Sequence, residues 1–137
     1  MKKMILKVGL FIGVVVMTAC GTKKAAVADS IAGNWKIVEV DGEKVADVEK
    51  TPEINFDVKE QRVNGNAGCN NFFGSFTYKN GALKFADNMG ATRMMCKNMK
   101  FEDKAFQSFP KIEKAVAKGK QLLLQDASGK TLFVLQK

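Results

Sequence analysis

The apolar residues of this chain fall mostly into short runs separated by turn signals, and this spacing constrains the fold more than any other feature. The runs are rich in β-branched and aromatic side chains and cover residues 34–40, 53–58, 72–78, 83–85, 121–125 and 131–136. In the second run, Ile54, Phe56 and Val58 alternate with polar residues, which is typical of a strand with one buried face. Asn80-Gly81 and residues 126–129 lie between runs and are typical of hairpin turns. The pattern therefore predicts a protein built mostly of strands.

One segment, from about Asn98 to Phe109, has the periodicity of a helix. Its apolar stripe recurs at spacings of three and four and consists of Phe101, Ala105, Phe106 and Phe109. Asn98 can cap the first turn, where two acidic residues suit the helix dipole. Pro110 is expected to end or kink the helix, because proline lacks the N–H that the helix interior needs. Residues 112–116 are expected to continue the same apolar face as a shorter helical turn.

The first 19 residues have the three parts of a secretory signal. A basic start is followed by an apolar run over residues 8–17, about half the length of a membrane span, and then by small residues. Thr18-Ala19-Cys20-Gly21 resembles the end of a bacterial lipoprotein signal, in which the cysteine thiol is acylated and the chain is cut before it. We therefore expect a signal peptide over residues 1–19 and lipid attachment at Cys20. The alternative is an ordinary secretory signal in which Cys20 lies near the cleavage site by chance.

Residues 20–30 are small and polar without periodicity, so they are expected to hold the lipidated cysteine and a flexible tether. The folded domain is expected over residues 31–137. Gly21 stands where lipoproteins retained in the inner membrane often carry aspartate, and lysines occupy the positions where an acidic surface-export signal would lie. We therefore expect a lipid-anchored protein of the cell envelope, on the periplasmic face of the outer membrane.

The other two cysteines, Cys69 and Cys96, form an isolated pair in a chain that is expected to mature in an oxidising compartment. Such a pair is a disulfide candidate. The alternative is two buried, reduced thiols that act as small apolar side chains. Because the chain has no histidine, no imidazole is present for Ser-His-Asp or Cys-His catalysis or for a histidine-ligated zinc site.

The middle of the chain resembles the META domain of HslJ-like proteins. The resemblance rests on Gly68-Cys69-Asn70-Asn71-Phe72-Phe73-Gly74-Ser75-Phe76, followed by Thr92-Arg93-Met94-Met95-Cys96. Flanking pieces occur in the family's order, so the resemblance covers residues 31–137. It implies an α+β fold in which a small, curved, barrel-like antiparallel β-sheet packs against one helix. It also implies an envelope or heat-inducible protein linked to antibiotic tolerance.

Four residues of these motifs are candidates for a ligand or partner site: Asn70, Asn71, Phe72 and Arg93. The glycine- and asparagine-rich loop at residues 65–71 either holds a polar ligand or forms a tight connection that orders the mouth of the sheet. The second interpretation is favoured, because the loop lacks the Gly-Lys-Ser/Thr of a phosphate cradle. Arg93 could bind an anion, or donate to loop carbonyls or to a carboxylate such as that of Asp57. Four methionines, at positions 89, 94, 95 and 99, are expected to fill the core flexibly.

These observations predict a non-enzymatic envelope lipoprotein that binds a protein or a small ligand, and the resemblance implies that it supports stress resistance or antibiotic tolerance. The alternative is a protein inhibitor module that blocks an envelope or host enzyme. We expect a monomer without cofactor or metal, bound to the membrane through its lipid and not to nucleic acid. A concave apolar pocket would favour a small ligand, whereas a protruding loop at residues 70–73 would favour an inhibitor.

Overall fold

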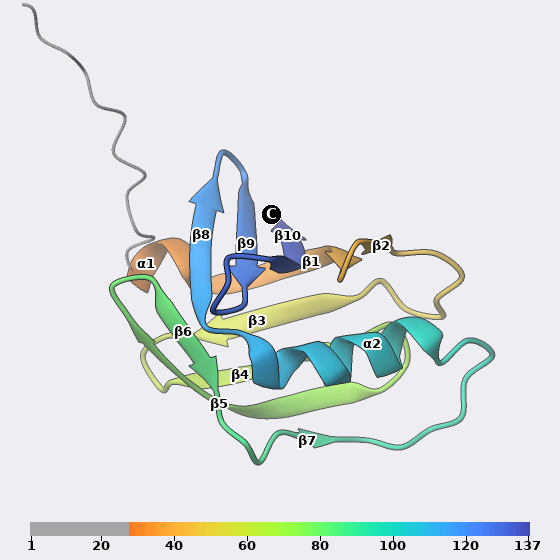
Figure 1. Ribbon diagram of the computed structural model, residues 1–137. Coiled ribbons are helices and arrows are strands. Elements are labelled where there is room, and N and C mark those ends of the chain that lie inside the picture. The colour runs from red at the N-terminus through yellow and green to blue at the C-terminus, as the bar shows by residue number, and fades with distance from the viewer. Residues whose placement is uncertain (1–27) are drawn as a thin grey trace, which may run out of the picture.

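The computed structural model describes residues 28–137 (Figure 1), so the expectations for the signal peptide, Cys20 and most of the tether lie outside the described residues. The elements in chain order are α1 (Ala28–Ile31), β1 (Gly33–Val40), β2 (Glu43–Lys44), β3 (Glu53–Asp57), β4 (Arg62–Asn66), β5 (Asn71–Lys79), β6 (Ala82–Phe85), β7 (Gly90–Ala91), α2 (Lys100–Ser108), the 3₁₀ turn η1 (Phe109–Lys111), β8 (Lys114–Lys118), β9 (Gln121–Gln125) and β10 (Thr131–Gln136). Every run that the sequence analysis predicts as a strand is a strand.

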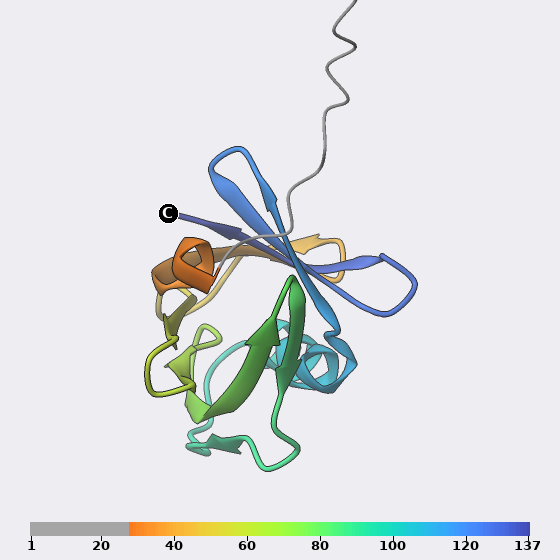
Figure 2. The ribbon, with the colours of Figure 1, turned by 90° about the vertical axis from the view of Figure 1, so that its left-hand side faces the viewer.

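The ten described strands form one sheet in the order β10-β9-β8-β6-β5-β4-β3-β1-β2, with β7 paired to β5. All pairings are antiparallel, and β10 also pairs with β1, so the sheet curls back on itself into a ring (Figure 2). The expected α+β fold with a curved antiparallel sheet is confirmed. The ring is not a regular barrel, because β6 and β8 are in register only at Ala82 and Lys114.

The core lies inside this ring and is centred on Phe109 of η1. The ring centroid of Phe109 is 4.9 Å from that of Phe72 on β5, 4.9 Å from that of Phe133 on β10 and 5.2 Å from that of Phe85 on β6. All four side chains are buried. Burial of each side chain contributes about 1.5–3 kcal/mol to stability. Through Phe109, η1 therefore packs against three strands of the sheet, β5, β6 and β10.

The helix that covers the sheet is shorter than predicted at its start and ends at the predicted place. α2 begins at Lys100 with Met99 as its N-cap residue, so Asn98 does not cap the helix as expected but lies one residue before the cap, where its side chain accepts a hydrogen bond from the Lys100 N–H at 3.1 Å. Pro110 lies in η1, where the helix tightens into a 3₁₀ turn and stops. The Phe106 ring of α2 packs edge-on against Phe72, which places the helix over β5 (Figure 1).

The prediction that residues 112–116 continue the helical face is wrong, because residues 114–118 form strand β8. All five residues of β8 are in register with β9. Ile112 and Ala115 are both buried, so their spacing of three fits a helix as well as it fits a loop followed by a strand. Pairing with β9 makes this segment a strand rather than a helix, and the periodicity of the sequence cannot predict that long-range contact.

The sequence predicts a loop over residues 65–71, but residues 65 and 66 belong to strand β4. The pattern of apolar runs does not predict this strand. Gly65 pairs with Ile54 of β3 and Phe72 of β5. A Cβ atom at this position would lie 2.1 Å from the carbonyl oxygen of Glu53, so only glycine allows the strands to approach this closely. The glycine that suggested a loop is therefore a packing requirement of the sheet.

An ion pair joins the β1–β2 turn to the β9–β10 connection and makes stability depend on pH. The Lys130 ammonium lies 2.5 Å from the Asp41 carboxylate, and its hydrogen bond and charge lower the pKa of Asp41 and raise that of Lys130. A lowered carboxyl pKa stabilises the fold above the unfolded value of 3.8, and this stabilisation is lost as the pH falls through the folded value. The raised pKa of Lys130 stabilises the fold below the unfolded value of 10.5, and this stabilisation is lost as the pH rises through the folded value.

We therefore expect Asp41→Asn to reduce the difference in free energy of unfolding between pH 6 and pH 3. Asparagine tolerates the positive φ of 45° at this turn, so the variant removes the charge without backbone strain. Urea unfolding at the two pH values measures the effect, with Asp47→Asn as a control at another positive-φ position. An unchanged pH dependence in Asp41→Asn would show that this ion pair does not contribute.

Candidate functional site

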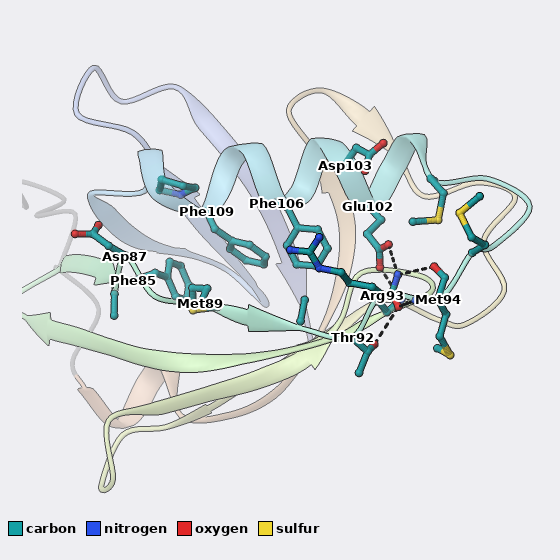
Figure 3. Close-up of a pocket in the computed structure, with 16 residues that line it drawn as sticks. Phe85, Asp87, Met89, Thr92, Arg93, Met94, Glu102, Asp103, Phe106 and Phe109 are labelled. Carbon is teal, nitrogen blue, oxygen red and sulfur yellow. Dashed lines mark hydrogen bonds between the residues drawn. The ribbon is translucent and has the colours of Figure 1, made fainter.

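A pocket of about 570 Å³ opens between α2 and the long connection from β6 to α2 (Figure 3). β6 supplies one side, the segment 86–99 another, and α2 with η1 the third. Asn70, from the connection between β4 and β5, lies at one end. The volume is within the range of pockets that hold small organic molecules.

The wall of the pocket is apolar where the helix meets the sheet. Phe85, Phe106 and Phe109 line it together with Met89. Met89 can approach β5 only because position 74 is glycine, since a Cβ atom there would lie 2.2 Å from the methionine sulfur. The sequence therefore supplies an aromatic wall and one flexible thioether, a combination that adapts to apolar ligands of different shape.

At the other end of the pocket, a buried carboxylate holds Asn70 in place. Glu102, on the first turn of α2, is 2% exposed and accepts hydrogen bonds from the Asn70 backbone N–H at 2.6 Å and from its side-chain amide at 2.7 Å. Both bonds are charge-assisted and span 32 residues of sequence. They fix the start of the helix to the connection between β4 and β5.

Asn70 in turn holds the segment that forms the outer wall of the pocket. Its side-chain oxygen accepts hydrogen bonds from the Met94 N–H at 2.6 Å and the Thr92 hydroxyl at 3.0 Å, and its amide also donates to the Met94 carbonyl at 3.1 Å. Every polar atom of the Asn70 side chain is thus used (Figure 3). The candidate loop residue Asn70 is therefore the structural link between the sheet, the helix and the pocket wall.

A disulfide between Cys69 and Cys96 fastens the same segment from its other side. The two Cα atoms are 6.2 Å apart and the bond closes a separation of 27 residues. Of the two alternatives for this pair, the structure has the disulfide. Residues 92–95 are consequently held at both ends, by Asn70 and by the bonded Cys96.

Arg93 projects from this fastened segment into the pocket, and Figure 3 shows its side chain extending in the direction of Phe106. Neither expected structural partner is used: within residues 28–137 the guanidinium has no ion pair and no hydrogen bond. The Asp57 carboxylate instead accepts a hydrogen bond from the Glu60 N–H at 3.0 Å. Arg93 therefore presents five unused donors beside an apolar wall.

Two further carboxylates belong to the lining, but both are exposed at its edge. Asp103 lies on α2, and Asp87 follows β6 at the other end of the pocket. Glu102 is buried and already bound by Asn70, whereas Asp87 and Asp103, like Arg93, are exposed to solvent, which screens the charges of all three. Within the described range, no group of three or more cysteine, aspartate and glutamate side chains is arranged to hold a metal ion.

The methionines do not fill the core as expected. All four line the pocket, and Met94 is 47% and Met95 94% exposed. The reason is the fastening of residues 92–96 by Asn70 and the disulfide, which keeps this segment on the outside of the pocket. Met89 is the one member that packs against the core cluster.

The other two candidate residues, Asn71 and Phe72, do not reach the pocket. Phe72 is buried in the core, and Asn71 is exposed at the start of β5, where its backbone pairs with Thr92. Sequence reasoning missed Glu102, which it assigned only a favourable place in the helix dipole. The available signal was that Glu102 stands three residues before Ala105 and seven before Phe109, on the apolar stripe itself.

No helix in the described part of the chain is long and apolar enough to cross a membrane. Comparison with solved structures shows the same fold in proteins of low sequence identity. One NMR structure of a protein is 23% identical, with a TM-score of 0.63 over 80% of this chain and 93% of that one. An NMR structure of a protein from Burkholderia xenovorans is 19% identical, with a TM-score of 0.63 over 82% and 86% of the two chains.

A third structure, of a DUF4847 family protein from Bacteroides vulgatus, is 12% identical, with a TM-score of 0.53 over 77% of this chain and 92% of that one. No curated protein matches the chain. The META domain matches residues 28–137, which is the whole of the described ring with its helix and pocket. The chain therefore belongs to the META domain family.

Proposed function

We propose that this META domain protein is a non-enzymatic lipoprotein of the cell envelope that binds a small ligand with an apolar body and a negatively charged end. Binding of such molecules would support envelope stress resistance or antibiotic tolerance. The proposal keeps the lipid anchor at Cys20 and the periplasmic face of the outer membrane, both of which rest on the lipoprotein signal in residues 1–21.

The observation that carries the ligand proposal is the placement of Arg93. A guanidinium that has no partner in residues 28–137 lies beside a wall of three phenylalanines, in a concave pocket of about 570 Å³. An apolar ligand body would bury the aromatic wall, and an anionic group would take the free donors of Arg93. Glu102 forms no ion pair with Arg93 within residues 28–137, and its two oxygens accept hydrogen bonds from Asn70 instead.

The shape of the connection between β4 and β5 favours a small ligand over the inhibitor alternative. An inhibitory loop has to protrude in order to enter another protein's active site, but residues 71–73 belong to strand β5 and pair with β4. Asn70 and Phe72 are each no more than 2% exposed, whereas Phe73 is 58% exposed on the outer face of the strand. The concave feature of this surface is the pocket. Its one buried carboxylate is held by a structural asparagine, which supports a binding role rather than acid–base catalysis.

Two dyes that differ by one charged group test the proposal. Anilinonaphthalene sulfonate carries an aromatic body and a sulfonate, and N-phenyl-naphthylamine has a closely similar body without the charge. We expect both to bind the full mature protein, and Arg93→Gln to weaken binding of the sulfonate roughly tenfold, about 1.4 kcal/mol, while the neutral dye is unaffected. Fluorescence titration measures both dissociation constants.

Arg62→Gln is the matched control, because Arg62 is the chain's other arginine and lies exposed on β4, outside the pocket lining. It should leave both dissociation constants unchanged. Equal weakening of the two dyes by Arg93→Gln would contradict the role of its charge. Tighter binding of a cationic dye, increased further by Arg93→Gln, would assign the pocket to cations through Asp87 and Asp103.

A further inference from the structure

We propose that one end of the sheet, formed by Lys36, Lys118, Lys120 and Lys137, rests on the anionic headgroups of the membrane that carries the lipid anchor. We call these four lysines the basic end. The inference rests on the proposed anchor at Cys20 and goes beyond it, because it states which face of the domain meets the membrane and which face remains free.

Strand register brings the basic end together from distant parts of the sequence. Lys36 of β1 is opposite Gln136 of β10, which is opposite Gln121 of β9, which is opposite Lys118 of β8. Three strand spacings separate Lys36 from Lys118, about 15 Å. Lys120 lies in the turn between β8 and β9, and this hairpin projects from the ring in both views (Figures 1 and 2).

Lys137 contacts the first residues of the described chain, so it shows where the chain begins relative to the basic end. Its ammonium donates a hydrogen bond to the Ala32 carbonyl at 3.1 Å and lies 4.8 Å from the centroid of the Trp35 ring. Ala32 directly follows α1, the element nearest to Cys20 in the chain. The basic end and the start of the domain are therefore on the same side of the molecule.

Chain length limits how far this side can be from the membrane. Seven residues lie between Cys20 and Ala28, so the eight steps between them span at most about 28 Å when fully extended. A lipid on Cys20 therefore keeps α1 close to the headgroups. The tether thus allows the lysines to come within a Debye length of the anionic surface, about 8–10 Å, where they are attracted to it.

Few carboxylates lie close enough to the basic end to offset its positive charge. Glu53 is the cross-strand neighbour of Lys36, but it also accepts a hydrogen bond from the Asn34 amide at 3.0 Å. All four lysines are exposed, and none has a carboxylate partner in the described part of the chain. The segment 86–99 lies on the opposite side of the molecule from the β8–β9 turn, with α2 between them (Figures 1 and 2), so the pocket would remain open to solvent.

Energy transfer from the chain's single tryptophan tests the orientation. Trp35 lies beneath Lys137, so transfer to dansyl-labelled lipid headgroups reports how close the basic end is to the membrane. The full lipidated protein is placed in vesicles of phosphatidylcholine alone or with phosphatidylglycerol. We expect greater transfer in the anionic vesicles, and loss of this increase at high salt because exposed charges are then screened.

Lys118→Glu/Lys120→Glu should remove more than half of the increase that phosphatidylglycerol causes. Lys118→Gln/Lys120→Gln provides the same test with a milder change if the glutamate variant does not fold. Lys97→Glu/Lys111→Glu is the matched control, because both lysines are exposed, neither has an ion pair within residues 28–137, and they lie close in sequence to the pocket-lining residues Met95, Met99 and Pro110. It should keep the full increase.

Two outcomes would overturn the inference in distinguishable ways. Equal transfer in the two kinds of vesicle, with the acyl mass present on Cys20, would show an anchored domain that does not turn its basic end to the membrane. An intact mass without acyl groups would contradict the proposed anchor itself, and the inference would be overturned with it. Dye binding by the pocket would be unaffected in both cases.

Discussion

Replacing Cys69 and Cys96 together with alanine is expected to lower the free energy of unfolding by about 3–4 kcal/mol. The disulfide closes a separation of 27 residues, and its loss restores the conformational freedom of that loop in the unfolded chain. This is a large share of the 5–15 kcal/mol that stabilises a typical domain. Urea unfolding of the mature protein measures the change.

Reducing agent supplies the control for the disulfide prediction. It should destabilise the wild-type protein by a similar amount and leave the double variant unchanged, since the alanine pair has no bond to break. A wild-type protein that is insensitive to reductant would show that the bond does not stabilise the fold. The double variant should also bind anilinonaphthalene sulfonate more weakly, because residues 92–95 then keep only their hydrogen bonds to Asn70 and Asn71.

Asn70→Asp is the second substitution with a large expected effect, about 3 kcal/mol of destabilisation with almost no change in side-chain volume. The aspartate would keep the oxygen that accepts from Thr92 and Met94, but its other oxygen would face the Glu102 carboxylate and the Met94 carbonyl, where the amide now donates. Two hydrogen bonds would become repulsions, and a second charge would be buried beside the first.

Asn71→Asp is the matched control, because it makes the same chemical change one residue later at an exposed side chain. Its free energy of unfolding should change by less than about 0.5 kcal/mol. Urea unfolding of the two variants and the wild type gives the comparison. Equal effects at both positions would show that the bond between Asn70 and Glu102 does not hold the fold together.

The local parts of the fold could be predicted because their signals are local. Alternation at Ile54, Phe56 and Val58 specifies a half-buried strand, and Asn80-Gly81 specifies a hairpin turn with positive φ at both residues. Pro110 ends the helix because proline has no N–H to donate, and this effect does not depend on tertiary contacts. Strands β4 and β8 were missed because their signals depend on neighbours: Gly65 makes room for Glu53, and Ala115 pairs with Leu124.

The candidate site was predicted only in part. Asn70 and Arg93 were identified from the motifs, and both line the pocket. The partner that gives Asn70 its role, Glu102, lies 32 residues away and looks like an ordinary acidic residue of a first helical turn. The pocket itself combines α2, β6 and the segment 86–99, and no property of a single segment indicates that these three meet.

The sequence by itself determined most of the strands, the helix and its end, the cysteine pair and the absence of histidine chemistry, because each depends on residues close together in the chain or on composition. Only the tertiary structure decided that Glu102 binds Asn70, that Arg93 has no partner among the described residues and lies beside an aromatic wall, and that four lysines from different parts of the chain share one end of the sheet. The physical reason is the same in each case. Hydrogen bonds, unpaired charges and clustered charges are properties of groups that folding brings together across long separations, and the order of residues along the chain does not specify them.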